Sequence, residues 1–162
     1  MNYQSIQLRI PTAEDGAQLH QLISECPPLD PNSIYCNLLH CSHFASTSIA
    51  AFKQDDLVGF ISGYVVPERP DTLFIWQVAV SDAARGEGLA SKMLDGIVNR
   101  PQLNGIHFLE TTITKDNPGS WALFRKFART RSTELNESVF FDKEKHFKGE
   151  HDSEHLARIG PF

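Results

Sequence analysis

The sequence predicts an α/β protein, because segments with strand and helix patterns alternate along its 162 residues. Short apolar, β-branched runs between turn residues predict strands at 6–10, 48–53, 57–66, 72–80, 106–114 and 138–141. Apolar residues at three- and four-residue spacing predict helices at 13–25, 31–41, from 89 to Pro101, and 117–127. The length suits one hydrophobic core, so we expect residues 1–162 to form a single domain.

Local signals mark where the first two helices begin. Thr12-Ala-Glu-Asp15 has the form of a capping box with Asp in place of Glu. Pro27, Pro28 and Pro31 interrupt the first helix. Asp30 stands where the N-cap of the second helix is expected, with Pro31 as its first residue.

Composition excludes several classes of protein. The formal net charge of −5 disfavours nucleic-acid binding. No apolar run approaches the roughly 20 residues of a membrane span, and the N-terminus lacks the pattern of a signal peptide. Three cysteines, an odd number, lie close together at Cys26, Cys36 and Cys41. This arrangement argues against a disulfide framework and favours a reducing cytoplasm.

The last residues, 142–162, are rich in histidine and acids and hold few apolar residues. We expect them to follow the last strand as a tail outside the core. His146, His151 and His155 with Glu154 could form a metal site. No thiolate or regular ligand pair accompanies them, so the sequence favours no metal.

The most informative stretch is the strand that ends at Val80 and the loop Arg85-Gly-Glu-Gly-Leu-Ala90 that opens the next helix. The first turn of a helix carries free N–H groups and partial positive charge. Gly86 and Gly88 let an anion approach the backbone, and Arg85 adds a bidentate cation. The loop lacks the patterns of a P-loop and of a dinucleotide fingerprint. The alternative is a glycine-rich helix start that binds nothing.

The pattern Arg85-x-x-Gly88-x-Ala90 resembles the coenzyme A pyrophosphate loop of the GCN5-related N-acetyltransferases (GNAT). A second element of that family recurs at 117–124, Asn-Pro-Gly-Ser-Trp-Ala-Leu-Phe. The resemblance implies the GNAT fold, a central mixed β-sheet with helices on both faces, and acetyl-CoA as co-substrate without a metal. It implies coenzyme contacts at Val78, Val80, Arg85, Gly86, Gly88, Leu89, Ala90, Asn117 and Phe124.

Two of these positions have alternatives. Asn117 could serve only as the N-cap of its helix. Position 124 is often Tyr in the family, where it acts as general acid for the leaving thiolate. Phe124 has no proton to give. The thiolate, whose pKa is near 8.5, could leave unassisted or be protonated through water.

Nearly the whole chain also resembles the GNAT enzymes that acetylate the γ-amine of L-2,4-diaminobutyrate in ectoine biosynthesis. The resemblance lies in residues 28–35, 74–80 and 146–160. It implies L-2,4-diaminobutyrate as substrate, a role in osmoadaptation, direct attack in a ternary complex and a cytoplasmic homodimer.

Within that resemblance, five residues suit a diamine with a carboxylate. Asp30 and Glu154 are candidate anchors for the α-ammonium, and Trp76 could form a wall or a cation–π face. Tyr35 and His151 could bond the carboxylate or relay the proton. The alternatives are that Asp30 is only a helix cap, Trp76 is core and Tyr35 faces solvent. Three competing functions are left open. They are acetylation of another small amine, acetylation of a protein N-terminus, and binding of acetyl-CoA without turnover.

Overall fold

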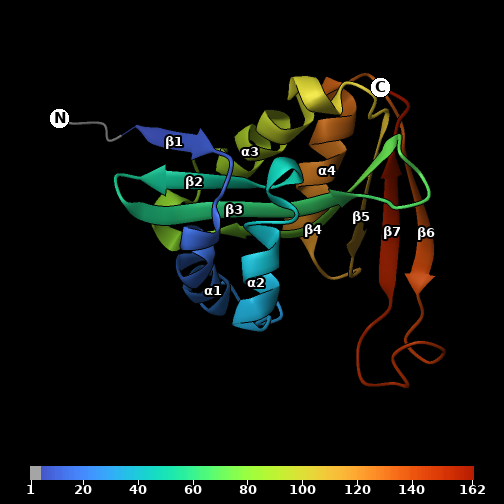
Figure 1. The fold of residues 1–162 in the computed structure, drawn as a ribbon. Helices are drawn as coiled ribbons and strands as arrows, with labels where there is room; N and C mark the ends of the chain where they lie inside the picture. Colours follow the sequence, from blue (N-terminus) through green and yellow to red (C-terminus); the bar gives the residue numbers. More distant parts are fainter. Residues whose placement is uncertain (1–4) are drawn as a thin grey trace. The chain divides into compact units, whose positions relative to one another are not determined.

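The structure is a computed structural model that describes residues 5–162 (Figure 1). Its helices are α1 (Gly16–Ser24), α2 (Ile34–His40), α3 (Leu89–Val98) and α4 (Pro118–Thr130). Its strands are β1 (Ile6–Arg9), β2 (Ile49–Lys53), β3 (Asp56–Val65), β4 (Thr72–Val80), β5 (Phe108–Ile113), β6 (Leu135–Phe141) and β7 (Glu154–Ile159). They hydrogen-bond in the order β1-β2-β3-β4-β5-β7-β6. β4 and β5 run parallel, whereas the β1–β2, β2–β3, β5–β7 and β6–β7 pairs are antiparallel, so the sheet is mixed as predicted.

Contacts within the chain define two compact units. The first contains the described residues up to Tyr64 together with Trp76–Asn104, and the second contains Val65–Ile75 and Gly105–Phe162. Strand β4 therefore contributes its first residues to the second unit and its last residues to the first. The single-domain organisation stays a prediction.

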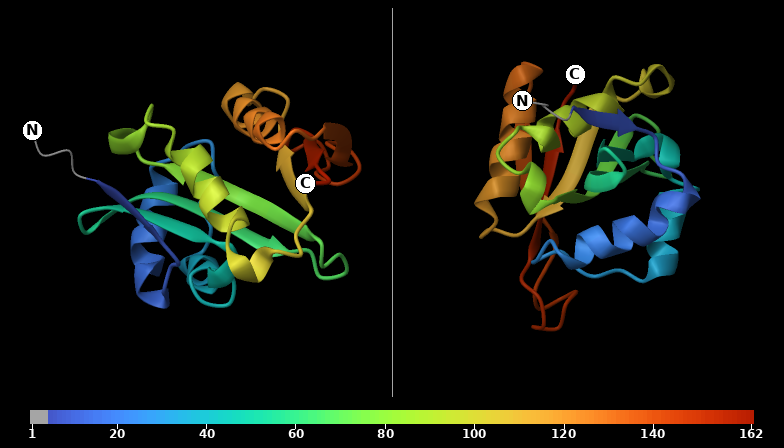
Figure 2. Two further views of the ribbon diagram at one scale, coloured as in Figure 1. Left: turned by 90° about the horizontal axis from the view of Figure 1, so that it is seen from above. Right: turned by 90° about the vertical axis from the view of Figure 1, so that its left-hand side faces the viewer.

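In the first unit, helices cover both faces of the strands (Figure 2). On one face, Leu19 and Leu22 of α1 pack in a buried cluster with Phe52 of β2 and Phe60 of β3. On the other face lies α3. A Cβ atom added at Gly59 of β3 would stand 2.9 Å from the Leu89 side chain and 3.0 Å from that of Met93. Gly59 therefore allows α3 to approach the strands closely.

The predicted first helix is a 3-10 turn, Ala13–Asp15, that continues into α1. The Asp15 carboxylate accepts the backbone N–H of Thr12 at 2.8 Å, as in a capping box. Both of its oxygens also accept N–H groups of Arg9, each at 2.8 Å. The ion pair fixes the end of β1 against the start of the helical segment.

The predicted start of the second helix is wrong. α2 begins at Ile34, and its N-cap is Ser33, whose hydroxyl accepts the N–H of Cys36 at 3.1 Å. Serine is as good a cap as aspartate, and Ser33 stands directly before the residues with helical backbone. Asp30 therefore does not cap α2, and Pro31 is not its first residue.

The expectation of a tail outside the core is wrong for residues 154–159. They form β7, which pairs with β5 on one side and with β6 on the other. Alternate residues His155, Ala157 and Ile159 are buried on one face, whereas Leu156 between them is half-buried. A strand covered on one face needs only every second residue in the core.

Candidate active site

The loop after β4 has the backbone that its glycines predict. Ser81 donates its N–H to the carbonyl of Val58 at 2.8 Å, and the 3-10 turn Asp82–Ala84 follows. Gly86 and Gly88 have φ of 80° and 70°, in the left-handed region that favours glycine. Gly88 is the N-cap of α3, so the chain enters the helix through a conformation that a Cβ atom would strain.

Open space lies where the side chains of these glycines would be. A Cβ atom at Gly86 or at Gly88 would meet no protein atom within 4 Å. The first-turn N–H groups of α3 and the positive end of its dipole lie at the same loop. This part of the chain can therefore take an anionic group such as a pyrophosphate.

Arg85 lies beside this loop, but its guanidinium pairs within the protein. It lies 3.1 Å from the Asp82 carboxylate and donates through Nε to the carbonyl of Val80 at 3.4 Å. The side chain is 57% exposed. An exposed pair of this kind contributes little to stability, so it can open to an anionic ligand.

The other predicted coenzyme contacts on β4 and α3 differ in exposure. Val78, Val80 and Ala90 are half-buried and Leu89 is buried. The parallel ladder between β4 and β5 pairs Thr72–Ile75 with Phe108–Thr111. Val78 and Val80 follow the end of that ladder.

In the second unit, Asn117 and Phe124 occupy the start and the buried face of α4. The Asn117 side chain accepts the N–H of Ser120 at 3.2 Å, which confirms the N-cap interpretation of this residue. Phe124 is 2% exposed. Contacts of either residue with the coenzyme stay a prediction.

Trp76 is not a core residue, because 37% of it is exposed. Its indole is stacked on the imidazole of His40, with ring centroids 4.8 Å apart and an interplanar angle of 25°. His40 itself is buried, and burial lowers the pKa of its imidazole below the ordinary value of 6.5. The uncharged ring therefore supports one face of the indole and leaves part of Trp76 accessible.

In the first unit, Asp30 precedes α2 and Tyr35 is a residue of α2. Asp30 is exposed, and its backbone carbonyl accepts an N–H of the Gln77 side chain at 3.2 Å. Tyr35 is 70% exposed on α2, where the alternative interpretation placed it. Neither side chain is taken up by the core, so both can reach a ligand.

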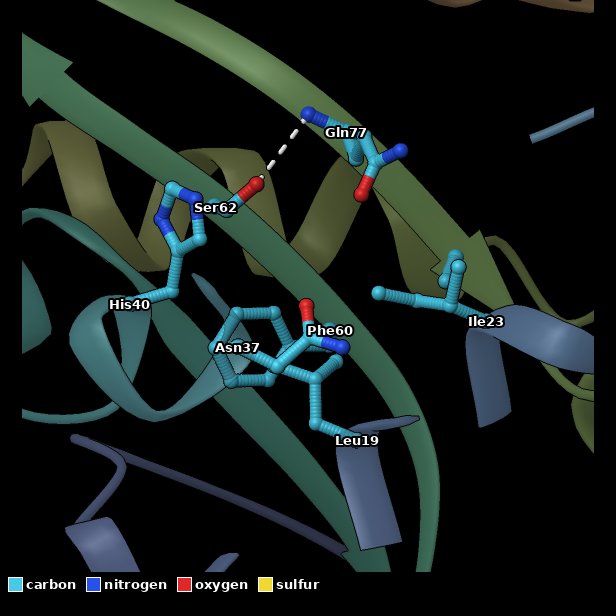
Figure 3. Close-up of a pocket in the computed structure, with 8 residues that line it drawn as sticks. Leu19, Ile23, Asn37, His40, Phe60, Ser62 and Gln77 are labelled. Carbon is cyan, nitrogen blue, oxygen red and sulfur yellow. Dashed lines mark hydrogen bonds between the residues drawn. The ribbon is translucent and has the colours of Figure 1, made fainter. Parts of the chain in front are cut away.

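A small, mainly apolar recess lies between α1, α2 and the strands (Figure 3). It measures about 200 Å³, which includes the open space in front of it. Its lining residues are Leu19, Ile23, Asn37, His40, Phe60, Ser62, Gln77 and Ala79. Figure 3 shows the Gln77 N–H directed at the Ser62 hydroxyl, 3.2 Å away.

The polar residues of this recess were not predicted from the sequence. One signal was available, because Gln77 is the only amide side chain in the apolar run 72–80. Asn37 and His40 are three residues apart, so they share one face of α2. Their burial is what identifies that face as the inner one.

In the second unit, the structure brings His151 close to Glu154, the first residue of β7. His151 Nε2 lies 4.0 Å from Glu154 Oε1. Nδ1 lies 2.6 Å from the carbonyl of Asp152, and because a carbonyl can only accept, Nδ1 carries the hydrogen. With the hydrogen on Nδ1, the neutral form of the ring has its lone pair on Nε2, the nitrogen that faces Glu154.

Comparison with known proteins identifies the family. The sequence profile of the Acetyltransferase (GNAT) family matches residues 16–128, more than half of the chain. The chain belongs to this family. The glycine loop at 85–90 lies within the matched region, and its role as the coenzyme loop stays a prediction.

Curated relatives of this GNAT protein are similar over almost its full length. An L-2,4-diaminobutyric acid acetyltransferase of Methylotuvimicrobium alcaliphilum is 57% identical over 97% of this chain and 91% of its own. One of Vibrio cholerae is 52% identical over 93% of this chain and 87% of its own.

Among solved structures, the diaminobutyrate acetyltransferase of Paenibacillus lautus, in complex with L-2,4-diaminobutyric acid and coenzyme A, has a TM-score of 0.93. It is 38% identical over 98% of this chain and 96% of that chain. The predicted GNAT fold is therefore confirmed.

Within residues 5–162 of this GNAT protein, no three His, Cys, Asp or Glu side chains are grouped so that they could hold a metal ion. None of the helices in that range has both the length and the apolar character needed to cross a membrane.

Proposed function

We propose that the protein is an acetyl-CoA-dependent L-2,4-diaminobutyrate N-γ-acetyltransferase of ectoine biosynthesis. The observation that carries this proposal is the full-length similarity to enzymes of that name, at 57% identity, and to one solved with diaminobutyric acid and coenzyme A. The open glycine loop at Gly86 and Gly88 supports coenzyme binding on physical grounds.

The proposed reaction is direct attack in a ternary complex. The γ-nitrogen of diaminobutyrate forms a bond to the thioester carbonyl carbon, the carbon–sulfur bond breaks, coenzyme A leaves as a thiolate, and the new amide nitrogen releases its second proton to water or to that thiolate. The attacking amine has to lose its proton first, because an alkylammonium with a pKa near 10 has no lone pair. His151, whose neutral form has its lone pair on Nε2, is the proposed acceptor of that proton.

Selectivity for the γ-amine requires that the α-amine stay protonated. A nearby carboxylate favours the charged form of an amine. Asp30 and Glu154 are the proposed carboxylates, Trp76 the proposed wall and Tyr35 a proposed partner of the substrate carboxylate. The exposed side chains of Asp30 and Tyr35 and the partly exposed Trp76 support these roles.

We also infer that the enzyme is a cytoplasmic homodimer. Every residue of β6 from Asn136 to Phe141 is exposed, and three of them, Val139, Phe140 and Phe141, are apolar. Contiguous exposed apolar side chains on a strand of this kind are typical of protein interfaces. The three cysteines are free thiols, as in a reducing compartment. Light scattering that gives a monomer mass would contradict the homodimer.

A thiol-release assay with acetyl-CoA and a panel of amines tests the activity. We expect turnover with L-2,4-diaminobutyrate and much slower release with polyamines, other amino acids and a peptide N-terminus. Faster turnover with another amine would mean that this amine, and not diaminobutyrate, is the substrate. Coenzyme binding without turnover on any amine would favour a binding module instead.

A further inference from the structure

Three polar side chains are buried in the first unit beside the segment that carries Asp30. Asn37 is fully buried, Ser62 is 3% exposed and Gln77 is 8% exposed. A buried amide destabilises a fold unless its hydrogen bonds are satisfied. Replacing both partners of such a hydrogen bond by apolar side chains of the same shape costs little stability. Two amides in an apolar recess therefore indicate that these side chains fix the position of a neighbouring segment.

Gln77 holds the segment before α2 at two points. Its Nε2 donates to the backbone carbonyl of Asp30 at 3.2 Å, and its Oε1 accepts from Nδ2 of Asn32 at 2.7 Å. Its own backbone N–H donates to the Ser62 hydroxyl at 3.2 Å. The side chain thus bridges β4 and residues 30–32, which are 45 to 47 positions earlier in the sequence.

Asn37 completes the arrangement from α2. Its Oδ1 accepts a second hydrogen bond from Asn32 Nδ2 at 3.2 Å, and its Nδ2 lies 3.0 Å from Nδ1 of His20 on α1. Because an amide nitrogen can only donate, His20 accepts through Nδ1. Asn32 is therefore held by both amides, and the segment is fixed to β4 and α2 together.

This segment has no regular structure of its own. No helix or strand covers residues 25–33, and Pro27, Pro28 and Pro31 have no N–H to donate. The side-chain amides supply hydrogen bonds that the backbone of a proline-rich segment cannot make with itself. We call Asn32, Asn37 and Gln77 the amide clamp.

We propose that the amide clamp positions Asp30 and so determines the preference of the enzyme for diaminobutyrate. Asn32, Asn37 and Gln77 are positioning residues: they act on the substrate through the place they give to the Asp30 carboxylate. Trp76, the neighbour of Gln77 in β4, is fixed by the same strand. The inference rests on the proposed function, since it assigns Asp30 to the α-ammonium of the substrate.

Steady-state kinetics of Gln77→Leu and Asn32→Ala test the proposal. Both variants remove the hydrogen bond between Asn32 and Gln77. Asn32→Ala changes only a half-buried loop residue and so spares the core. We expect KM for diaminobutyrate to rise about tenfold while kcat and KM for acetyl-CoA stay within about twofold. We also expect faster hydrogen exchange in residues 29–33.

Thr47→Val is the matched control. Its buried hydroxyl donates to the carbonyl of Gly63 at 2.6 Å in the same unit. It should lower the melting temperature and leave both KM values unchanged. If Thr47→Val raises KM for diaminobutyrate as much as Gln77→Leu does, the effect is general destabilisation and the proposal is wrong.

A double-mutant cycle shows whether Gln77 acts through Asp30. In an Asp30→Ala background, Gln77→Leu should have no further effect on KM for diaminobutyrate. Additive effects would overturn the proposal. If the wild-type enzyme does not turn over diaminobutyrate, the proposed function fails, whereas unchanged exchange of residues 29–33 in Asn32→Ala would refute the clamp itself.

Discussion

The imidazole of His40 is stacked on the indole of Trp76 at 4.8 Å, and burial keeps its pKa below 6.5. The folded protein therefore binds this proton less readily than the unfolded chain. By linkage, the contribution of His40 to stability is fully present above pH 6.5 and is lost as pH falls through its lower folded pKa.

The His40→Phe variant keeps a ring against Trp76 and removes the titration. We expect its melting temperature to fall less than that of the wild type between pH 7.5 and pH 5. His43→Gln, a change at an exposed histidine three residues away, is the control and should follow the wild type. Equal acid sensitivity in all three proteins would contradict the buried, neutral state of His40.

The ion pair between Arg9 and Asp15 contributes in the same direction, but starting from a lower pH. Burial would raise the pKa of Asp15, but the hydrogen bonds from Arg9 and Thr12 lower it below 3.8. A carboxylate with a lowered pKa stabilises the fold above pH 3.8, and this contribution is lost as pH falls through the folded pKa.

Asp15→Asn should therefore lower the free energy of unfolding by about 1–3 kcal/mol at pH 7, since Arg9 is partly exposed. The difference from the wild type should shrink in acid. Urea unfolding at pH 7 and at pH 3 measures it, with the exposed neighbour Glu14→Gln as control. An undiminished difference at pH 3 would show that the charge is not its source.

Gly88→Val tests the coenzyme loop. The open space at this position leaves the fold intact, but a β-branched residue disfavours φ of 70° and its methyl groups would stand where a phosphate approaches. We expect calorimetry to show loss of acetyl-CoA binding by a folded variant. Gly105→Val, also in open space but without a positive φ, should bind normally. Unchanged affinity of Gly88→Val would remove this loop from the coenzyme site.

Phe124→Tyr tests whether the reaction lacks a general acid. If the thiolate leaves without one, the added hydroxyl should change kcat by less than tenfold. The residue is 2% exposed, so overpacking should lower stability by about 1–3 kcal/mol. Phe127→Tyr, at a buried position of the same helix, controls for this loss. A gain of a hundredfold or more, within the roughly 10²–10⁴ range of acid–base catalysis, would show that protonation limits the wild-type rate.

Local patterns predicted those elements that local chemistry determines. Strand 72–80 has the bounds of β4, because its apolar residues end at loop residues on both sides. Asn117 caps α4 as its place before Pro118 indicated. The loop glycines have the positive φ that their spacing suggested.

Features that depend on distant partners were missed. The residues of β7 are ordered by β5 and β6, and their polar composition concealed the alternation that buries Ala157 and Ile159. Gln77 meets Asp30 across 47 positions, a distance at which no local pattern pairs two residues. The sequence indicated the candidate residues Asp30, Trp76 and Glu154 only through resemblance.

The position of the acetyl group in the product tests the central claim most directly. The α-amine of diaminobutyrate is the less basic one and would more readily attack in free solution, so γ-acetylation requires an enzyme that keeps the α-ammonium charged. NMR of the product formed from acetyl-CoA and L-2,4-diaminobutyrate distinguishes the two nitrogens. We predict acetyl on the γ-nitrogen alone, and a product acetylated on the α-nitrogen would contradict the proposed function.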